Sequence, residues 1–180
     1  MIEKSVSVIG AGAATTIING GNTPIASAGM VRINLPLADT GNVTFSGFTL
    51  TNPGLTGGSR YHIFGKPISP LSTVTISNNR ITGVSSSDYG LYSDRPVGSV
   101  VFDHNEITNT AFNPILIERP TGATDVHHNT ISGHGATAYF NFTYSGNDVA
   151  GKQRVADNTI TGSAATAISI NGASPIGGGL

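Results

Sequence analysis

Apolar and polar residues follow a recurring ten-residue pattern along most of the chain. Five segments share this pattern without gaps, and they begin 31, 26, 24 and 29 residues apart. Each has an apolar residue at its third position and Ile or Leu at its eighth, with mostly polar residues between them. Such self-similarity indicates a repeat architecture. The segments are VTFSGFTLTN from Val43, VTISNNRITG from Val74, VVFDHNEITN from Val100, TDVHHNTISG from Thr124 and QRVADNTITG from Gln153.

A second apolar segment lies between the copies, as in YGLYSD from Tyr89 and NPILIE from Asn113. Each repeat therefore predicts three short strands, and no long helical stripe of apolar residues appears. Parallel strands in an ordinary sheet need helical crossovers of about a dozen residues or more, which these spacings do not allow. The strands can instead coil, each turn stacking on the last with strands about 4.8 Å apart. We expect one all-β domain over 1–180, with a degenerate first coil over 5–35 and a Gly-rich tail over 172–180.

The sixth position of the pattern is Asn in every copy except the first. The chain must bend sharply here, and Asn tolerates the left-handed conformation that such a bend requires. Stacked side-chain amides can also hydrogen-bond to one another along the coil axis. We expect Gly47 to supply the bend in the copy without Asn. The predicted asparagine ladder consists of Asn79, Asn105, Asn129 and Asn158.

This coil pattern with its Asn ladder resembles that of the right-handed parallel β-helix proteins, the pectate-lyase-like superfamily. The resemblance extends from about Ser5 to Asn171 and lies in the repeat, not in the site of any one member. It implies a single-stranded right-handed parallel β-helix of about six coils, with three short strands per coil. It also implies an extracellular protein that binds or processes an extended, acidic polysaccharide along its outer face. The complete motif of a polysaccharide lyase or a glycoside hydrolase is missing, so enzymatic activity stays open.

The alternative is a non-catalytic structural, adhesin-like or truncated β-helix. Members of the superfamily usually begin with an amphipathic helix that caps the first coil, whereas this chain opens almost directly with SVSVIGAGAATTIING. Uncapped coil ends expose unpaired strand edges, which favours pairing with another chain. We therefore expect either a fragment of a longer β-helix or a homo-oligomer joined at the coil ends.

The amino-acid composition excludes several classes of binding partner and cofactor. Charged residues make up 11% of the chain and the net charge is −1, so we expect neither nucleic acid nor a membrane surface as a partner. No apolar run approaches the roughly 18 residues of a membrane span, and the N-terminus lacks the pattern of a signal peptide. The absence of Cys excludes disulfides and thiolate metal sites, and no cofactor is expected.

The first candidate site follows the apolar segment between copies, where charged residues recur directly before Pro. Two carboxylates on neighbouring coils would have backbones about 4.8 Å apart, a spacing comparable with the roughly 5–9.5 Å between glycosidase carboxyl groups. Cations in this column could bind an acidic sugar, or neutralise a uronate for β-elimination with Arg or Lys as the base. The alternative is a solvated ladder of salt bridges. The catalytic candidates are Asp94, Arg95, Glu118 and Arg119, and the substrate-binding candidates are Lys66, Arg95, Arg119 and the stacking rings Tyr92 and Tyr139.

The second candidate site lies in the column directly before the ladder. His104, His128 and Asp157 occupy this position on three successive coils. Two imidazoles and a carboxylate can bind a divalent metal, and the alternative is a polar ladder that faces water. Because neighbouring residues of a strand alternate, we expect His127 to point to the opposite side from His128 if the strand continues through both.

Overall fold

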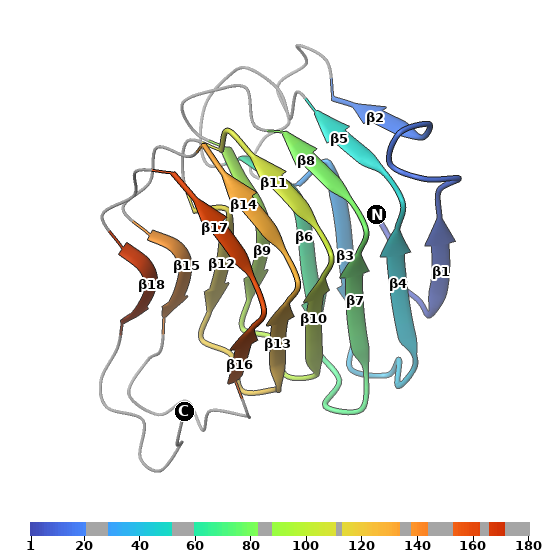
Figure 1. The fold of residues 1–180 in the computed structure, drawn as a ribbon. Helices are drawn as coiled ribbons and strands as arrows, with labels where there is room; N and C mark the ends of the chain where they lie inside the picture. The colour runs from blue at the N-terminus through green and yellow to red at the C-terminus, as the bar shows by residue number, and fades with distance from the viewer. Residues whose placement is uncertain are drawn as a thin grey trace.

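The structure, a computed structural model, describes residues 1–20, 29–51, 60–82, 88–110, 113–133, 138–143, 153–162 and 166–171. Within these ranges the chain forms strands and turns, and it contains no helix. None of these residues therefore belongs to a helix long and apolar enough to cross a membrane. The strands form three parallel sheets of six strands each (Figure 1).

The first sheet collects the strand that opens each repeat. Its strands pair in the register that the gapless alignment of the repeats requires: Phe45 pairs with Ile76, and Ile76 with Phe102. In spatial order they are β1 (Val6–Ile9), β4 (Asn42–Ser46), β7 (Thr73–Ser77), β10 (Ser99–Asp103), β13 (Thr124–His127) and β16 (Gln153–Ala156).

The second sheet consists of strands of three residues that follow the turn of each repeat. The central residue of each strand is Ile or Leu and points inward, and Ile81, Ile107 and Ile131 pair in register. In order along the sheet these strands are β2 (Ile17–Asn19), β5 (Thr49–Thr51), β8 (Arg80–Thr82), β11 (Glu106–Thr108), β14 (Thr130–Ser132) and β17 (Thr159–Thr161).

The third sheet contains the strands that connect one repeat to the next. Ile63 pairs with Leu91, and Leu91 pairs with Ile115, so the inward positions again coincide. Its strands are β3 (Val31–Leu35), β6 (Arg60–Pro67), β9 (Asp88–Asp94), β12 (Ile115–Glu118), β15 (Ala138–Thr143) and β18 (Thr166–Asn171).

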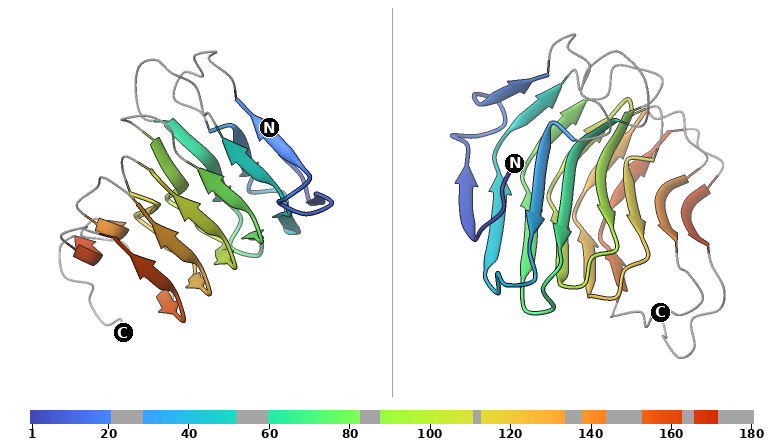
Figure 2. Two further views of the ribbon diagram at one scale, coloured as in Figure 1. Left: turned by 45° about the horizontal axis from the view of Figure 1, so that its top comes forward. Right: turned by 180° about the vertical axis from the view of Figure 1, so that it is seen from behind.

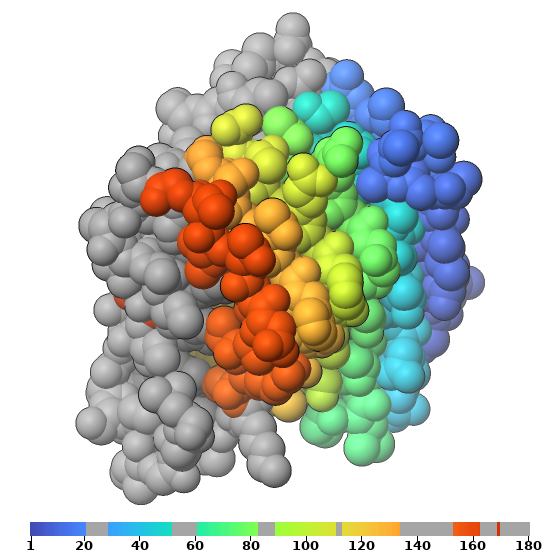
Figure 3. All heavy atoms as spheres, viewed as in Figure 1, coloured from blue at the N-terminus to red at the C-terminus, as the bar shows by residue number. Residues whose placement is uncertain are grey.

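Successive strands enter three different sheets, and every third strand returns beside its predecessor. Figure 2 shows this stacking from two further directions, and in Figure 3 successive repeats form adjacent bands from blue to red. The arrangement is a β-solenoid with three short strands per repeat, which confirms the predicted all-β repeat.

The core fills the space between the sheets. Phe102 and Ile107, at the third and eighth positions of one repeat, are both 0% exposed. The equivalent Val155 and Ile160 of the last trio of strands are only partly buried. A central repeat contacts a neighbour on either side, so its core side chains are covered more completely.

The predicted Asn ladder is confirmed. The amide of Asn79 donates to Asn105 Oδ1 at 3.1 Å, that of Asn105 to Asn129 Oδ1 at 3.0 Å, and that of Asn129 to Asn158 Oδ1 at 2.9 Å. The first member, Asn79, accepts the backbone N–H of Phe48 at 3.1 Å. The ladder therefore joins the turns of five consecutive repeats.

The predicted position of the bend is wrong by one residue. The left-handed conformation belongs to the residue before the ladder Asn, as in Asn78 with φ 54° and His104 with φ 51°. Gly47 occupies the same position with φ 83°, as predicted. Because the bend lies one residue earlier, the side chain of the ladder Asn points into the stack of repeats. The amide of Asn105, for example, donates to the backbone carbonyl of Ile76 and to Asn129 Oδ1.

Candidate functional site

Outward-pointing side chains on β3, β6, β9 and β12 form two rows, because these strands pair in register. Inward residues such as Ile33 and Ile63 belong to the core, and the residues that follow them, Asn34 and Phe64, point outward. The first row is Arg32, Phe64, Tyr92 and Leu116. The second row is Asn34, Lys66, Asp94 and Glu118. We call both rows, together with Tyr61, Arg95 and Arg119, the charged face.

Asp94 is the centre of the charged face. Its carboxylate lies 2.8 Å from Arg119 Nη2, 3.5 Å from Lys66 Nζ and 3.8 Å from Arg95 Nε. The structure therefore brings four of the predicted site residues into one network. Arg95 remains 61% exposed, so its guanidinium is the most accessible charge of the network.

Glu118 is the register partner of Asp94 and has a different neighbour. The hydroxyl of Tyr92 donates to Glu118 Oε2 at 2.6 Å. Burial of Tyr92, followed by this hydrogen bond and the charge of Glu118, raises the pKa of Tyr92 far above its usual range. Tyr92 is therefore a protonated donor to Glu118.

Aromatic rings lie beside the charged network. Tyr61 stacks on Tyr92 with a centroid distance of 4.2 Å, and Phe64 lies 5.4 Å from Tyr92. The guanidinium carbon of Arg32 lies 5.7 Å from the centre of the Phe64 ring, within cation–π range. Tyr92 is only 8% exposed, whereas Tyr61 and Phe64, the other two rings of the charged face, are partly exposed. Tyr139 lies in β15, and its side chain is outside the described part.

Sequence reasoning missed Arg32 and Phe64. Both residues belong to the first row because β3 pairs with β6. This pairing was hard to predict, since 24 residues separate the end of β3 from the start of β6. The detectable signal was the alternation of Val31, Arg32 and Ile33, which marks Arg32 as an outward residue.

Arg95 and Arg119 occupy equivalent turn positions at the ends of β9 and β12. Both have φ 48°, and the N–H of Arg95 donates to the carbonyl of Glu118 at 2.7 Å. The left-handed turn directs both guanidinium groups back toward the Asp94 carboxylate. This geometry limits which substitutions the two positions accept without strain.

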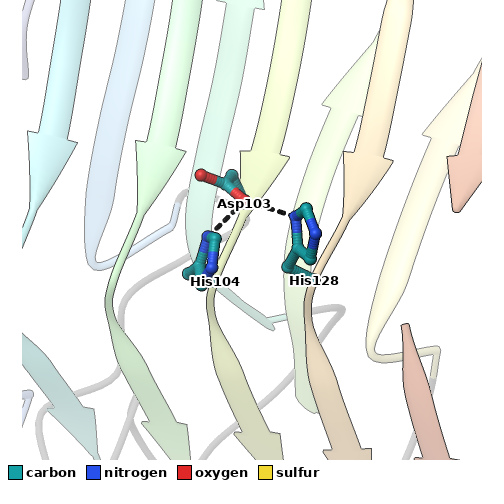
Figure 4. Close-up of side chains that lie close together, drawn as sticks. All are labelled: Asp103, His104 and His128. Atoms are coloured by element: carbon teal, nitrogen blue, oxygen red, sulfur yellow. Dashed lines mark hydrogen bonds and ion pairs between the residues drawn. The ribbon is translucent and has the colours of Figure 1, made fainter. Parts of the chain in front are cut away.

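The predicted metal candidates lie at the turns between the first and second sheets. Asp103 Oδ1 lies 2.5 Å from His104 Nδ1 and 3.5 Å from His128 Nδ1 (Figure 4). The rings of His104 and His128 stack at 4.7 Å. Asp157, which was predicted as the carboxylate of this set, instead lies 3.9 Å from the far nitrogen of His128. The structure therefore groups the two imidazoles with Asp103.

His127 and His128 do not point to opposite sides, because the strand that this expectation required does not continue through both residues. Their Nδ1 atoms lie 2.7 Å apart, and His127 Nδ1 lies 2.9 Å from Asp103 Oδ1. Strand β13 ends at His127, and His128 adopts φ 53°, so the alternation of a strand does not continue through this pair. We call Asp103, His104, His127 and His128 the Asp–His cluster.

The charged face and the Asp–His cluster lie on different sheets of the solenoid, and both are built from residues that recur at equivalent positions of neighbouring repeats. Comparisons of the chain with models of protein families, with curated proteins and with solved structures found no match. A function can therefore be inferred only from the geometry of the charged face and of the Asp–His cluster.

Proposed function

We propose that the chain is a right-handed, single-stranded parallel β-helix of six coils that binds an extended acidic polysaccharide along the charged face. The three parallel sheets and the Asn ladder support the coil. The handedness, and the likeness to pectate-lyase-like proteins, rest on the resemblance of the repeat.

The observation that carries the proposal is the composition of the charged face. Four cations face only two carboxylates, although the whole chain has a net charge of −1. Local positive charge favours an anionic ligand. The rows run across successive strands, about 4.8 Å apart, and therefore present repeated contacts to an extended polymer. The cations are Arg32, Lys66, Arg95 and Arg119, and the carboxylates are Asp94 and Glu118.

The contacts of the two carboxylates favour binding over cleavage. Asp94 is paired with Arg119 and Lys66, and Glu118 accepts a hydrogen bond from Tyr92. A carboxylate that acts as a general acid or base must reach the proton it transfers, directly or through one water molecule. Cleavage would therefore require the ligand to displace these neighbours first, whereas the exposed guanidinium of Arg95 can bind an acidic sugar without rearrangement.

Replacing both Arg95 and Arg119 with Asn is expected to weaken binding to a polyuronate at least tenfold. A hydrogen bond to a charged group contributes about 1.5–3 kcal/mol, and about 1.4 kcal/mol corresponds to a factor of ten in affinity. Asn is chosen because both positions have φ 48°, which Asn tolerates. Calorimetric titration with polygalacturonate and alginate measures the effect.

The control is an R80N/R154N variant, which makes the same change of charge on the other two sheets. It should bind the polyuronates as the unmodified chain does. Neutral polysaccharides should bind weakly to all three proteins. The proposal fails if the unmodified chain binds no polyuronate, or if the two double variants lose affinity equally.

A second candidate function is structural self-association, and the edge formed by β1 and β2 favours it. These are the terminal strands of their sheets, and no described strand pairs with their outer edges. Val6 is 38%, Ile9 71% and Ile17 62% exposed on these strands. A free edge with exposed apolar side chains is a template for pairing with a second copy of the chain.

Size-exclusion chromatography over a hundredfold range of concentration tests this association. The unmodified chain should shift from dimer to monomer on dilution, and an I9K/I17K variant should stay monomeric. Leu71→Lys is the control, because Leu71 is 72% exposed but lies in the turn before β7. A monomer at every concentration would exclude this function.

A further inference from the structure

The Asp–His cluster is a compact block of four polar side chains at two consecutive turns. Asp103 and His127 are register partners at the ends of β10 and β13. His104 and His128 follow them at the left-handed positions. His104 is 55% and His128 46% exposed, whereas Asp103 and His127 are 24% and 18% exposed. The block thus has a shielded side and an open side.

The scaffold does not require Asp or His at these positions. In the two preceding repeats the same pair of positions holds Ser46 with Gly47, and Ser77 with Asn78. Both repeats form the same left-handed turn, and in the second of them Asn79 is bonded like Asn105. The concentration of three imidazoles and a carboxylate at two adjacent turns therefore needs an explanation beyond the fold.

The cluster brings several candidate metal ligands close together. Zn²⁺ binds imidazole nitrogen at about 2.0–2.1 Å in a tetrahedron, which places neighbouring ligand atoms about 3.3 Å apart. Asp103 Oδ1 lies 2.5, 2.9 and 3.5 Å from the Nδ1 atoms of His104, His127 and His128. One ligand atom each from Asp103, His104 and His128 lies within 4.8 Å of the others. A bound ion would require the two shorter separations to lengthen, and the exposed rings of His104 and His128 to turn toward it.

Several lone pairs converge at the centre of the cluster. The Nδ1 atoms of His127 and His128 lie 2.7 Å apart, so only one of them can carry a hydrogen toward the other. The second Nδ1 presents a lone pair on the side where the Asp103 carboxylate also presents one. A cation at this point accepts both lone pairs, whereas a proton can bridge only one pair of atoms.

Carboxylates also face the outer nitrogens of two of these rings. Asp125 lies 3.7 Å from His127 Nε2, and Asp157 lies 3.9 Å from His128 Nε2. Arg154 holds Asp125 in place with a contact of 2.9 Å. Histidines that bind a metal through one nitrogen commonly direct the other toward a carboxylate, which orients the ring.

We propose that the Asp–His cluster binds one divalent transition-metal ion of the Zn²⁺ class. The ligands are the carboxylate of Asp103 and the Nδ1 atoms of His104, His127 and His128. Imidazole with one carboxylate suits Zn²⁺ and the neighbouring late transition metals, whereas Ca²⁺ and Mg²⁺ take oxygen ligands. The site links two successive repeats, and it does not rest on the proposed polysaccharide function.

Calorimetric titration of the untagged chain with Zn²⁺ tests the site. One equivalent should bind, and the midpoint of thermal unfolding should rise with Zn²⁺ because only the folded chain holds the four ligands together. An H104N/H128N variant should bind Zn²⁺ at least a hundredfold more weakly and lose the thermal shift. Asn is chosen because Asn78 occupies the equivalent left-handed position of the preceding repeat.

Two further variants complete the test. Asp103→Ser introduces the residue of the preceding repeat, Ser77, and should weaken Zn²⁺ binding at least tenfold. Asn78→Gly changes the same column one repeat earlier and should bind Zn²⁺ as the unmodified chain does. The proposal is overturned if the unmodified chain shows no saturable Zn²⁺ binding, or if H104N/H128N retains the affinity and the thermal shift.

Discussion

An Asn105→Ala variant is expected to lose about 3–5 kcal/mol of its free energy of unfolding. The Asn105 side chain is 1% exposed and takes part in four hydrogen bonds. It accepts from the backbone and the side chain of Asn79, and it donates to the carbonyl of Ile76 and to Asn129 Oδ1. Each buried group left without its partner costs about 1–3 kcal/mol, and relaxation of the turn offsets part of the sum.

The matched control for this variant is Asn42→Ala. Asn42 is exposed and accepts one hydrogen bond, from the N–H of Thr73 at 3.2 Å. Its loss should cost no more than about 1 kcal/mol, since water replaces an exposed partner. Equilibrium unfolding in urea, followed by circular dichroism, measures both variants. Equal losses in the two variants would contradict a stabilising role for the ladder.

A Phe102→Ala variant is also expected to lose about 3–5 kcal/mol, the usual cost of truncating a buried Phe. Phe102 is fully buried, and its register partners are Ile76 and Val126. A cavity at this position therefore removes contacts with the repeats on both sides. Because each repeat of a solenoid contacts only its neighbours, the loss weakens two adjacent interfaces.

Val101→Ala provides the control within the same strand. Val101 points to the opposite face of β10 and is only half-buried. Its truncation should cost about 1 kcal/mol or less. The same urea titration compares the two variants. If Val101→Ala destabilised the chain as much as Phe102→Ala, the assignment of the inward face of this sheet would be wrong.

The sequence predicted those properties that each repeat specifies locally. The third and eighth positions must be apolar in every copy, because each strand buries alternate residues, and Phe102 and Ile107 are accordingly enclosed. The ladder could also be predicted, since identical residues of stacked repeats become spatial neighbours. Asn105 therefore bonds to Asn79 and Asn129 although 26 and 24 residues separate them.

Part of the charged face could be predicted for the same reason. Asp94, Arg95, Glu118 and Arg119 recur at equivalent positions of neighbouring repeats, and the structure places Asp94 beside Glu118. Arg32 and Phe64 could not be placed, because the strands that carry them are joined through a segment of irregular length. Their register follows from the pairing of β3 with β6.

The tertiary structure alone decided which polar side chains meet at the turns. The sequence by itself determined an all-β repeat with a ladder of Asn. The spacing of its apolar residues requires short strands, and stacking of the repeats brings the equivalent Asn residues together. It did not determine that the residue before each ladder Asn takes the left-handed conformation. That single backbone rotation breaks the alternation of β13, directs His127 and His128 to the same side, and brings both to Asp103. A side chain's direction at a turn depends on backbone angles, which the order of apolar and polar residues does not specify.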